Sequence, residues 1–199
     1  MSQLDLSKHN LTEIPNLPTD IKVFKAHCNN ITKIENLPPN LTYLELVDNK
    51  ITKIENLPQS LTCLHLANNK ITKIKNLPLS LATLCLAHNQ ITKIENLPQT
   101  LTHLNLDTNQ ITTIENLPQS IKYLYLSYNQ ITKIKNMPQS IKSLYLSDNK
   151  INEIKDIPQS LTSLHIYNRF IDINKLRLLM DLDLLYNIEL DIVLEEFLF

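Results

Sequence analysis

Apolar and polar residues alternate along this chain in a pattern that repeats every twenty residues, from Met1 to about Ile171. The repeating unit reads roughly LTxLxLxxNxITxIxNLPxS, and no insertion interrupts it. One such unit is too short to bury its own apolar residues, so consecutive units must stack on one another. The pattern therefore predicts one elongated solenoid over residues 1–171 and not a string of separate domains.

Each unit predicts one turn of a coil, as the copy LTCLHLANNKITKIKNLPLS illustrates. Leu64 and Leu66 alternate with exposed neighbours, which is the period of a strand with one buried face. Apolar residues from Ile71 to Leu77 then return to the interior at three-residue spacing, and Pro78 prevents a helix from continuing. We expect parallel strands on the concave side and extended or 3₁₀ segments on the convex side.

One polar position recurs at the bend that follows nearly every strand. Its side-chain amide is placed to satisfy backbone groups that lose their partners as the chain leaves the sheet. Stacking of the turns predicts an asparagine ladder along the molecule, made of Asn29, Asn49, Asn69, Asn89, Asn109, Asn129 and Asn149.

The block LxxLxLxxNxI with its trailing LP resembles the leucine-rich repeat family. The twenty-residue period is similar to that of the short class found in secreted bacterial effectors, and the segment from Ile14 to Pro18 matches that class's ending. The ITKI segments are also similar to internalin-type repeats. The resemblance implies a β-rich, right-handed leucine-rich repeat solenoid. The lack of glycine and the abundance of Ile, Lys and Asn are typical of an AT-rich genome, such as that of a giant virus, a protist or a low-GC bacterium.

The repeat fails after Asn168, where Arg169 takes the ladder position. Solenoids need terminal units with a polar outer face. We therefore expect residues 172–199 to form a C-terminal cap of two short helices, over 174–185 and 188–198, with a β-hairpin as the alternative. The first strand has no cap before it, and its open edge predicts homodimerisation through the N-terminal end.

Composition and charge narrow the function classes. The net charge of −1 gives no general attraction to nucleic acid or to an anionic membrane, and neither is expected as a partner. The first ten residues lack the features of a secretory signal, so we expect a cytoplasmic protein, or one in the host cytoplasm if it is viral or an effector. Without glycine the chain has no phosphate-binding loop, and we expect no cofactor.

The cysteines and histidines offer little chemistry. Cys63 and Cys85 fall on neighbouring strands two positions out of register, about 8 Å apart, which is too far for a disulfide and predicts free thiols. His65 lies beside Cys85, but no further donors fall within reach of a tetrahedral metal, so no metal site is expected. A nucleophilic Cys85–His65 pair would lack oxyanion donors and shelter from water. We therefore expect no catalytic residues and no enzymatic activity.

The exposed strand positions and the following bend vary between units, whereas the convex half repeats ITKIENLP or ITKIKNLP almost unchanged. Either the strand positions drifted freely after duplication or they were diversified for binding. Tyrosine offers rigid, amphipathic contact area that suits a binding surface. We predict a non-enzymatic module that binds a protein partner on its concave face through His103, Tyr123, Tyr125, Tyr128, Tyr145, His165, Tyr167, Tyr43 and His65. A glycan-binding surface on the same face and a self-assembling structural protein are the alternatives.

The convex side carries a stripe of lysines that could attract a polyanion, at Lys33, Lys53, Lys73, Lys93 and Lys133. A stripe of glutamates two positions away offsets it, at Glu35, Glu55, Glu95 and Glu115. We therefore interpret the convex side as a solvated, mixed-charge face.

Overall fold

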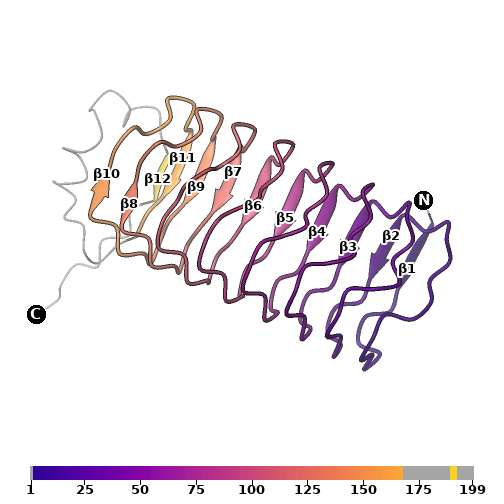
Figure 1. Ribbon diagram of the computed structural model, residues 1–199. Coiled ribbons are helices and arrows are strands. Elements are labelled where there is room, and N and C mark those ends of the chain that lie inside the picture. The colour runs from indigo at the N-terminus through magenta and orange to yellow at the C-terminus, as the bar shows by residue number, and fades with distance from the viewer. Residues whose placement is uncertain (1, 168–188, 192–199) are drawn as a thin grey trace, which may run out of the picture.

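The computed structural model describes residues 2–167 and 189–191 of the chain. Within this part the chain winds into a parallel β-solenoid and forms no helix, so no helix there could cross a membrane (Figure 1). The main sheet is built, in order, from β1 (Gln3–Asp5), β2 (Val23–Lys25), β3 (Tyr43–Glu45), β4 (Cys63–His65), β5 (Thr83–Cys85), β6 (His103–Asn105), β7 (Tyr123–Tyr125), β9 (Ser143–Tyr145), β11 (Ser163–His165) and β12 (Glu189–Asp191).

The sheet register follows the sequence period. From β1 to β11, each strand pairs in parallel with the strand one repeat earlier, so that Leu44 faces Leu64 and Leu64 faces Leu84. Two further short strands, β8 (Lys133–Ile134) and β10 (Glu153–Ile154), pair in parallel on the opposite side of the coil (Figure 1). Residues at the same repeat position therefore form columns that run along the molecule, as predicted.

The apolar positions of each turn meet inside the coil. Leu64, Leu66 and Ile71 have no solvent-exposed surface, and the same positions are buried in the neighbouring turns. Leu77 is only partly buried, while the following Pro78 is buried against the core. Burying one aliphatic side chain contributes roughly 1.5–3 kcal/mol before the loss of chain entropy, so stacking of turns supplies the driving force for folding.

The asparagine ladder is confirmed. The Oδ1 atom of Asn69 accepts a hydrogen bond of 2.9 Å from the backbone N–H of Ile51 in the previous turn. Its Nδ2 atom donates to the carbonyl oxygens of Leu46, Leu66 and Ala67, at 2.9, 3.1 and 3.1 Å. Each such amide therefore bridges two turns, and its oxygen satisfies a buried N–H of the previous turn.

A second asparagine column on the convex side was not predicted. Asn76 adopts a left-handed backbone conformation, with φ of 54°, and its Nδ2 donates to the carbonyl oxygen of Ile54 in the previous turn at 3.3 Å. Most turns also hold a left-handed residue at the bend after the strand, such as Asn68 and Thr108. Asparagine tolerates this region better than other non-glycine residues, which gives the constant NLP segment a structural reason.

The C-terminal prediction is only partly tested. Residues 189–191 form strand β12, paired in parallel with β11, so the helix expected over 188–198 is wrong at these residues. The alternative β-hairpin is not tested, because its other strand lies outside the described residues. The remainder of the expected cap, including 174–185, lies outside the described residues.

Candidate binding surface on the concave face

Two columns of side chains project from the concave side of the sheet, one from the first and one from the third residue of each strand. In the strands of the main sheet from β2 to β11, the middle residue is buried and the two flanking residues remain accessible to solvent. Parallel strands in register lie about 4.8 Å apart, so side chains in one column touch their neighbours. Seven of the nine predicted binding residues fall into two clusters on this face, and the other two follow β7 and β11.

Three rings form a continuous stack at the C-terminal end of the concave face. Tyr125 and Tyr145 stack with ring centroids 4.5 Å apart and planes inclined by 16°. Tyr145 also stacks on His165, at 4.1 Å and 4°. The three residues come from β7, β9 and β11, so the stack runs along the solenoid axis and across the strands.

A second stack lies beside the first on β6 and β7. The rings of His103 and Tyr123 are 4.5 Å apart and inclined by 18°. Tyr123 and Tyr125 project from the same face of β7, two residues apart. Burial raises the pKa of the Tyr125 phenol, and the nearby Tyr145, Asp107 and Tyr123 add to this effect. The two stacks therefore form one patch, which we call the aromatic patch: His103, Tyr123, Tyr125, Tyr145 and His165.

The tyrosine hydroxyls of the aromatic patch are available to a ligand. Among the described residues, no hydrogen bond joins the phenol oxygen of Tyr123, Tyr125 or Tyr145 to another group. His165 differs, because its Nε2 lies 2.9 Å from the Oγ of Ser163. The ring faces are thus used for mutual stacking, and the three phenol hydroxyls remain without a partner among the described residues.

Tyr43 and His65 form a separate cluster near the N-terminal end. The Tyr43 hydroxyl donates a 2.9 Å hydrogen bond to Oε2 of Glu45, which also lies 3.6 Å from Nζ of Lys25. The same lysine sits 5.6 Å from the Tyr43 ring centroid, and the His65 ring is 5.5 Å away on the other side. Burial, followed by the contact with Glu45, raises the pKa of Tyr43. The Tyr43 hydroxyl, Glu45 and Lys25 therefore contact one another, whereas the tyrosine hydroxyls of the aromatic patch have no such partner among the described residues.

Tyr128 and Tyr167 do not join either stack. Tyr128 occupies the left-handed bend after β7, with φ of 56° and 59% of its surface exposed. The negative charge of Asp148, and a hydrogen bond to it, raise the pKa of the Tyr128 phenol. Tyr167 follows β11 and is held through its backbone, which donates to Ser147 and accepts from Asp148.

The cysteines lie where the register predicts. His65 pairs with Cys85 across neighbouring strands, while Cys63 pairs with Thr83, and all three cysteines are free. Burial raises the pKa of Cys63 to about 11 and also raises that of Cys85, and it lowers the pKa of His65. These shifts oppose a thiolate–imidazolium pair, which needs the reverse. The described residues include no group of three or more His, Cys, Asp or Glu side chains that could hold a metal ion.

A carboxylate beside the aromatic patch was missed. Asp107 follows β6 at a position where the preceding two turns carry Ala67 and Ala87. Burial raises its pKa, although its Oδ1 accepts a 2.7 Å hydrogen bond from the backbone N–H of Ser127, which opposes the rise. The change from alanine to aspartate in one column was the sequence signal that could have drawn attention to it.

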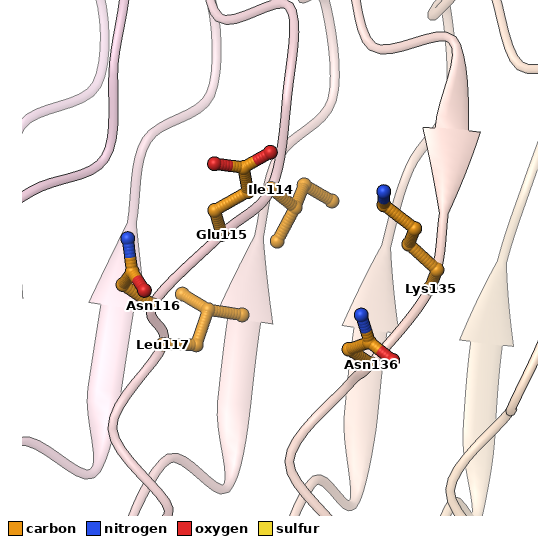
Figure 2. A pocket seen from close by; sticks show the side chains of 6 residues that line it. All are labelled: Ile114, Glu115, Asn116, Leu117, Lys135 and Asn136. Atoms are coloured by element: carbon orange, nitrogen blue, oxygen red, sulfur yellow. The ribbon is translucent and has the colours of Figure 1, made fainter.

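The convex side carries shallow hollows between neighbouring turns. One, of about 300 Å³, is lined by Ile114, Glu115, Asn116, Leu117, Lys135 and Asn136 (Figure 2). Another, of about 370 Å³, is lined by Thr52, Lys53, Ile54, Glu55, Thr72, Lys73, Lys75 and Asn76. Opposite charges pair on this side, since Nζ of Lys133 lies 2.9 Å from Glu153. Both hollows mix lysine and glutamate, which agrees with a mixed-charge face.

The architecture is similar to that of solved bacterial proteins, among them leucine-rich repeat effectors. YopM from Yersinia enterocolitica is 28% identical over 82% of this chain, with a TM-score of 0.74, and this chain spans 41% of it. A Shigella effector leucine-rich repeat domain is 26% identical over 89% of this chain and 73% of its own, with a TM-score of 0.64. The functional domain of InlJ from Listeria monocytogenes is 29% identical, covering 83% of this chain and 39% of its own, with a TM-score of 0.70.

Two family models match different parts of the chain. A model of two leucine-rich repeat copies matches residues 39–79 and 79–119, and the FNIP repeat model matches residues 109–149 and 128–166. No curated protein is significantly similar in sequence. The constant leucine, asparagine and isoleucine columns, the parallel sheet and the solved relatives agree. The chain folds as a leucine-rich repeat solenoid of the short-repeat type, and its C-terminal turns also match the FNIP repeat.

Proposed function

We propose that this protein is a non-enzymatic interaction module that binds a protein partner on the concave face of its sheet. One observation carries the proposal. The aromatic patch gathers five rings on neighbouring strands and leaves the hydroxyls of Tyr123, Tyr125 and Tyr145 without partners within the described part of the chain. Amphipathic rings held rigidly in this way supply contact area and hydrogen bonds at a low cost in side-chain entropy.

The chemistry of the face supports binding over catalysis. The thiols of Cys63 and Cys85 have raised pKa values, and neither forms a hydrogen bond with His65 in the part of the chain that the structure describes. An open sheet also gives a reacting group little shelter from water.

Stacking within the patch favours a protein partner over a glycan. A sugar ring packs best against the free face of an aromatic ring, whereas both faces of Tyr145 are already covered by Tyr125 and His165. The unpartnered phenol hydroxyls suit the backbone carbonyls and polar side chains of a protein. Binding of the purified chain to a glycan array, with no protein captured, would favour the alternative.

The decisive experiment compares captured partners of three proteins. The triple variant Tyr123→Ala, Tyr125→Ala and Tyr145→Ala should lose the partner that the unmodified chain retains after proximity labelling in the native cell. A convex variant, Lys33→Ala with Lys53→Ala and Lys73→Ala, is the matched control and should keep it. Circular dichroism must show that each variant retains its sheet. Retention by the concave variant together with loss by the convex variant would reject the proposal.

The mass of the purified chain in solution provides a separate check. A protein that acts by self-assembly should form oligomers whose size rises with concentration. Strand β1 lies at one end of the sheet in the described structure and offers an edge for such pairing. Light scattering that shows a monomer at high concentration would remove the self-assembly alternative and leave the concave face as the binding surface.

A further inference from the structure

We propose that the concave face recognises an acidic segment of a protein, whose carboxylates pair with Lys122 and Lys142 while its backbone crosses the aromatic patch. This inference rests on the proposed function and specifies the chemistry of the partner. Three features support it: two adjacent lysines in one column of the coil, the unpaired tyrosine hydroxyls beside them, and the aspartates at the other end of the strands.

The residue before each strand forms a column at one margin of the concave face. Most of its members are neutral, and two adjacent lysines occur only at the starts of β7 and β9. From β1 to β11 of the main sheet the column reads Ser2, Lys22, Thr42, Thr62, Ala82, Thr102, Lys122, Lys142 and Thr162. The backbone N–H of Lys142 donates a 2.8 Å hydrogen bond to the carbonyl of Lys122, so the two residues are direct neighbours. The cationic pair therefore coincides with the strands that carry the tyrosines.

Lys122 and Lys142 lack an internal counterion in the part of the chain that the structure describes. Both side chains are exposed, and neither belongs to an ion pair within these residues. Lys25 provides the contrast, because Glu45 neutralises it in the N-terminal cluster. Two like charges on adjacent strands repel each other, and an anionic ligand would relieve that repulsion.

The groups around the lysine pair are hydrogen-bond donors. The ammonium groups donate only, and the unpaired hydroxyls of Tyr123, Tyr125 and Tyr145 lie on the same strands or next to them. Ionised carboxylates accept hydrogen bonds and cannot donate them, and charge-assisted contacts of this kind are stronger than neutral ones. The donor-rich surface thus complements a segment with glutamate or aspartate side chains.

Carboxylates on the other margin give the complex a direction. Asp107 and Asp148 lie where the chain leaves the strands, whereas the two lysines lie where it enters them, and the aromatic rings lie between. Asp107 is held by the backbone N–H of Ser127, and Asp148 interacts with Tyr128. They would repel acidic residues, so the acidic side of the partner lies over the lysines and the segment runs along the solenoid axis.

The spacing is compatible with ordinary protein segments. Neighbouring strands place the two lysine backbones about 4.8 Å apart, and alternate residues of an extended chain lie about 6.5–7 Å apart on one side. The long lysine side chains bridge this difference. Two acidic residues separated by one position, or by three to four positions in a helix, therefore reach both ammonium groups.

The test pans the full chain against a random dodecapeptide library and measures selected peptides by fluorescence anisotropy. Enriched sequences should carry at least two Asp or Glu residues at a fixed spacing. The double variant Lys122→Ser and Lys142→Ser should weaken binding about five- to tenfold, as expected for two exposed ion pairs. Panning against Lys122→Glu with Lys142→Glu should instead enrich Lys and Arg. The convex double variant Lys53→Glu and Lys73→Glu is the control and should select the same acidic peptides as the unmodified chain.

Two outcomes separate this inference from the proposed function. Peptides that lose affinity for the Tyr125→Ala and Tyr145→Ala variant, but show no acidic preference and no response to the lysine variants, would overturn the inference and leave concave binding intact. Peptides that respond to neither set of variants would overturn both. Tighter binding of heparin or of a single-stranded oligonucleotide to the same lysines, lost in the lysine variants, would also overturn the acidic protein segment as the occupant.

Discussion

The rings of Tyr145 and His165 lie face to face, with centroids 4.1 Å apart and planes 4° from parallel. Tyr145 also stacks on Tyr125, so aromatic rings cover both of its faces. In-register parallel strands create this arrangement, because their spacing of about 4.8 Å is close to the distance at which rings stack. The sheet orders the three rings before a partner arrives, which lowers the entropy lost on binding.

Tyr145 should therefore contribute more to stability than its neighbour at the end of the stack. One ring pair contributes about 0.5–1.5 kcal/mol beyond area burial, so Tyr145→Ala, which breaks two pairs, should cost about twice the stacking energy lost in Tyr125→Ala. Tyr145→Phe keeps both pairs and should change the free energy of unfolding little. Urea denaturation measures all three. Equal losses for the two alanine variants would contradict the central role of Tyr145.

The period was enough to predict the columns but not the contacts within them. Tyr43 and Tyr123 occupy the same column, and the sequence placed both on the binding surface. The structure gives them different neighbours. Tyr43 lies beside Lys25 of the neighbouring strand and bonds Glu45 on its own strand, whereas Tyr123 stacks on His103. Pairing in a column depends on which side chains happen to be neighbours, and alternation of apolar and polar residues carries no such information.

The left-handed positions escaped prediction for another reason. Glycine usually marks a positive φ, and this chain has none. Asn76 and its equivalents recur in nearly every turn, and their constancy has a conformational cause. The bend column was harder still, because it contains residues as different as Asn68, Thr108 and Tyr128, all with φ between 52° and 56°. Regular stacking imposes this conformation whichever side chain is present.

The two asparagine columns should differ in their contribution to stability. Asn69→Ala leaves the buried N–H of Ile51 without a partner and removes one of the hydrogen bonds to each of the carbonyls of Leu46 and Leu66, and it should cost about 2–4 kcal/mol. Asn76→Ala removes one 3.3 Å hydrogen bond and forces alanine into the left-handed region, which should cost about 1–2 kcal/mol. Urea denaturation of both variants gives the order. A larger loss for Asn76→Ala would show that backbone strain outweighs the ladder hydrogen bonds.

Thr108 offers a stabilising substitution. This β-branched residue has φ of 54°, a region that asparagine visits readily and threonine avoids. Thr108→Asn should raise the free energy of unfolding by about 0.5–1 kcal/mol, while the reverse change at the same repeat position, Asn68→Thr, should lower it by a similar amount. Thermal and urea denaturation test the pair. A destabilised Thr108→Asn protein would mean that the threonine side chain makes contacts worth more than the strain.

Asp107 should make stability depend on pH in a defined direction. Burial raises its pKa, so between the ordinary value near 4 and the raised value the folded state binds more protons than the unfolded state. Its contribution to stability therefore falls as pH rises through that window. Asp107→Asn keeps an oxygen that can accept from Ser127 and removes the charge, so its advantage over the unmodified chain should be smallest below pH 4 and largest at neutral pH. An advantage that does not vary with pH would contradict this assignment.

The three thiols should react at very different rates. Cys28 is exposed at a left-handed bend, with its Sγ 3.6 Å from Oδ2 of Asp48, whereas burial raises the pKa of both Cys63 and Cys85. With a pKa of about 11, roughly one Cys63 in 3000 is a thiolate at pH 7.5, and only the thiolate is nucleophilic. Brief treatment with iodoacetamide followed by peptide mass spectrometry should therefore find the label on Cys28.

The Cys28→Ser protein should stay almost unlabelled under the same conditions, and unfolding in urea should make the remaining thiols react. Rapid labelling of folded Cys85 that disappears in His65→Ala would be the informative failure. It would mean that the imidazole activates the adjacent thiol despite the burial of both groups, and the concave face would then have to be reconsidered as a reactive site. Slow labelling that is insensitive to His65→Ala is the result expected of a face that binds and does not react.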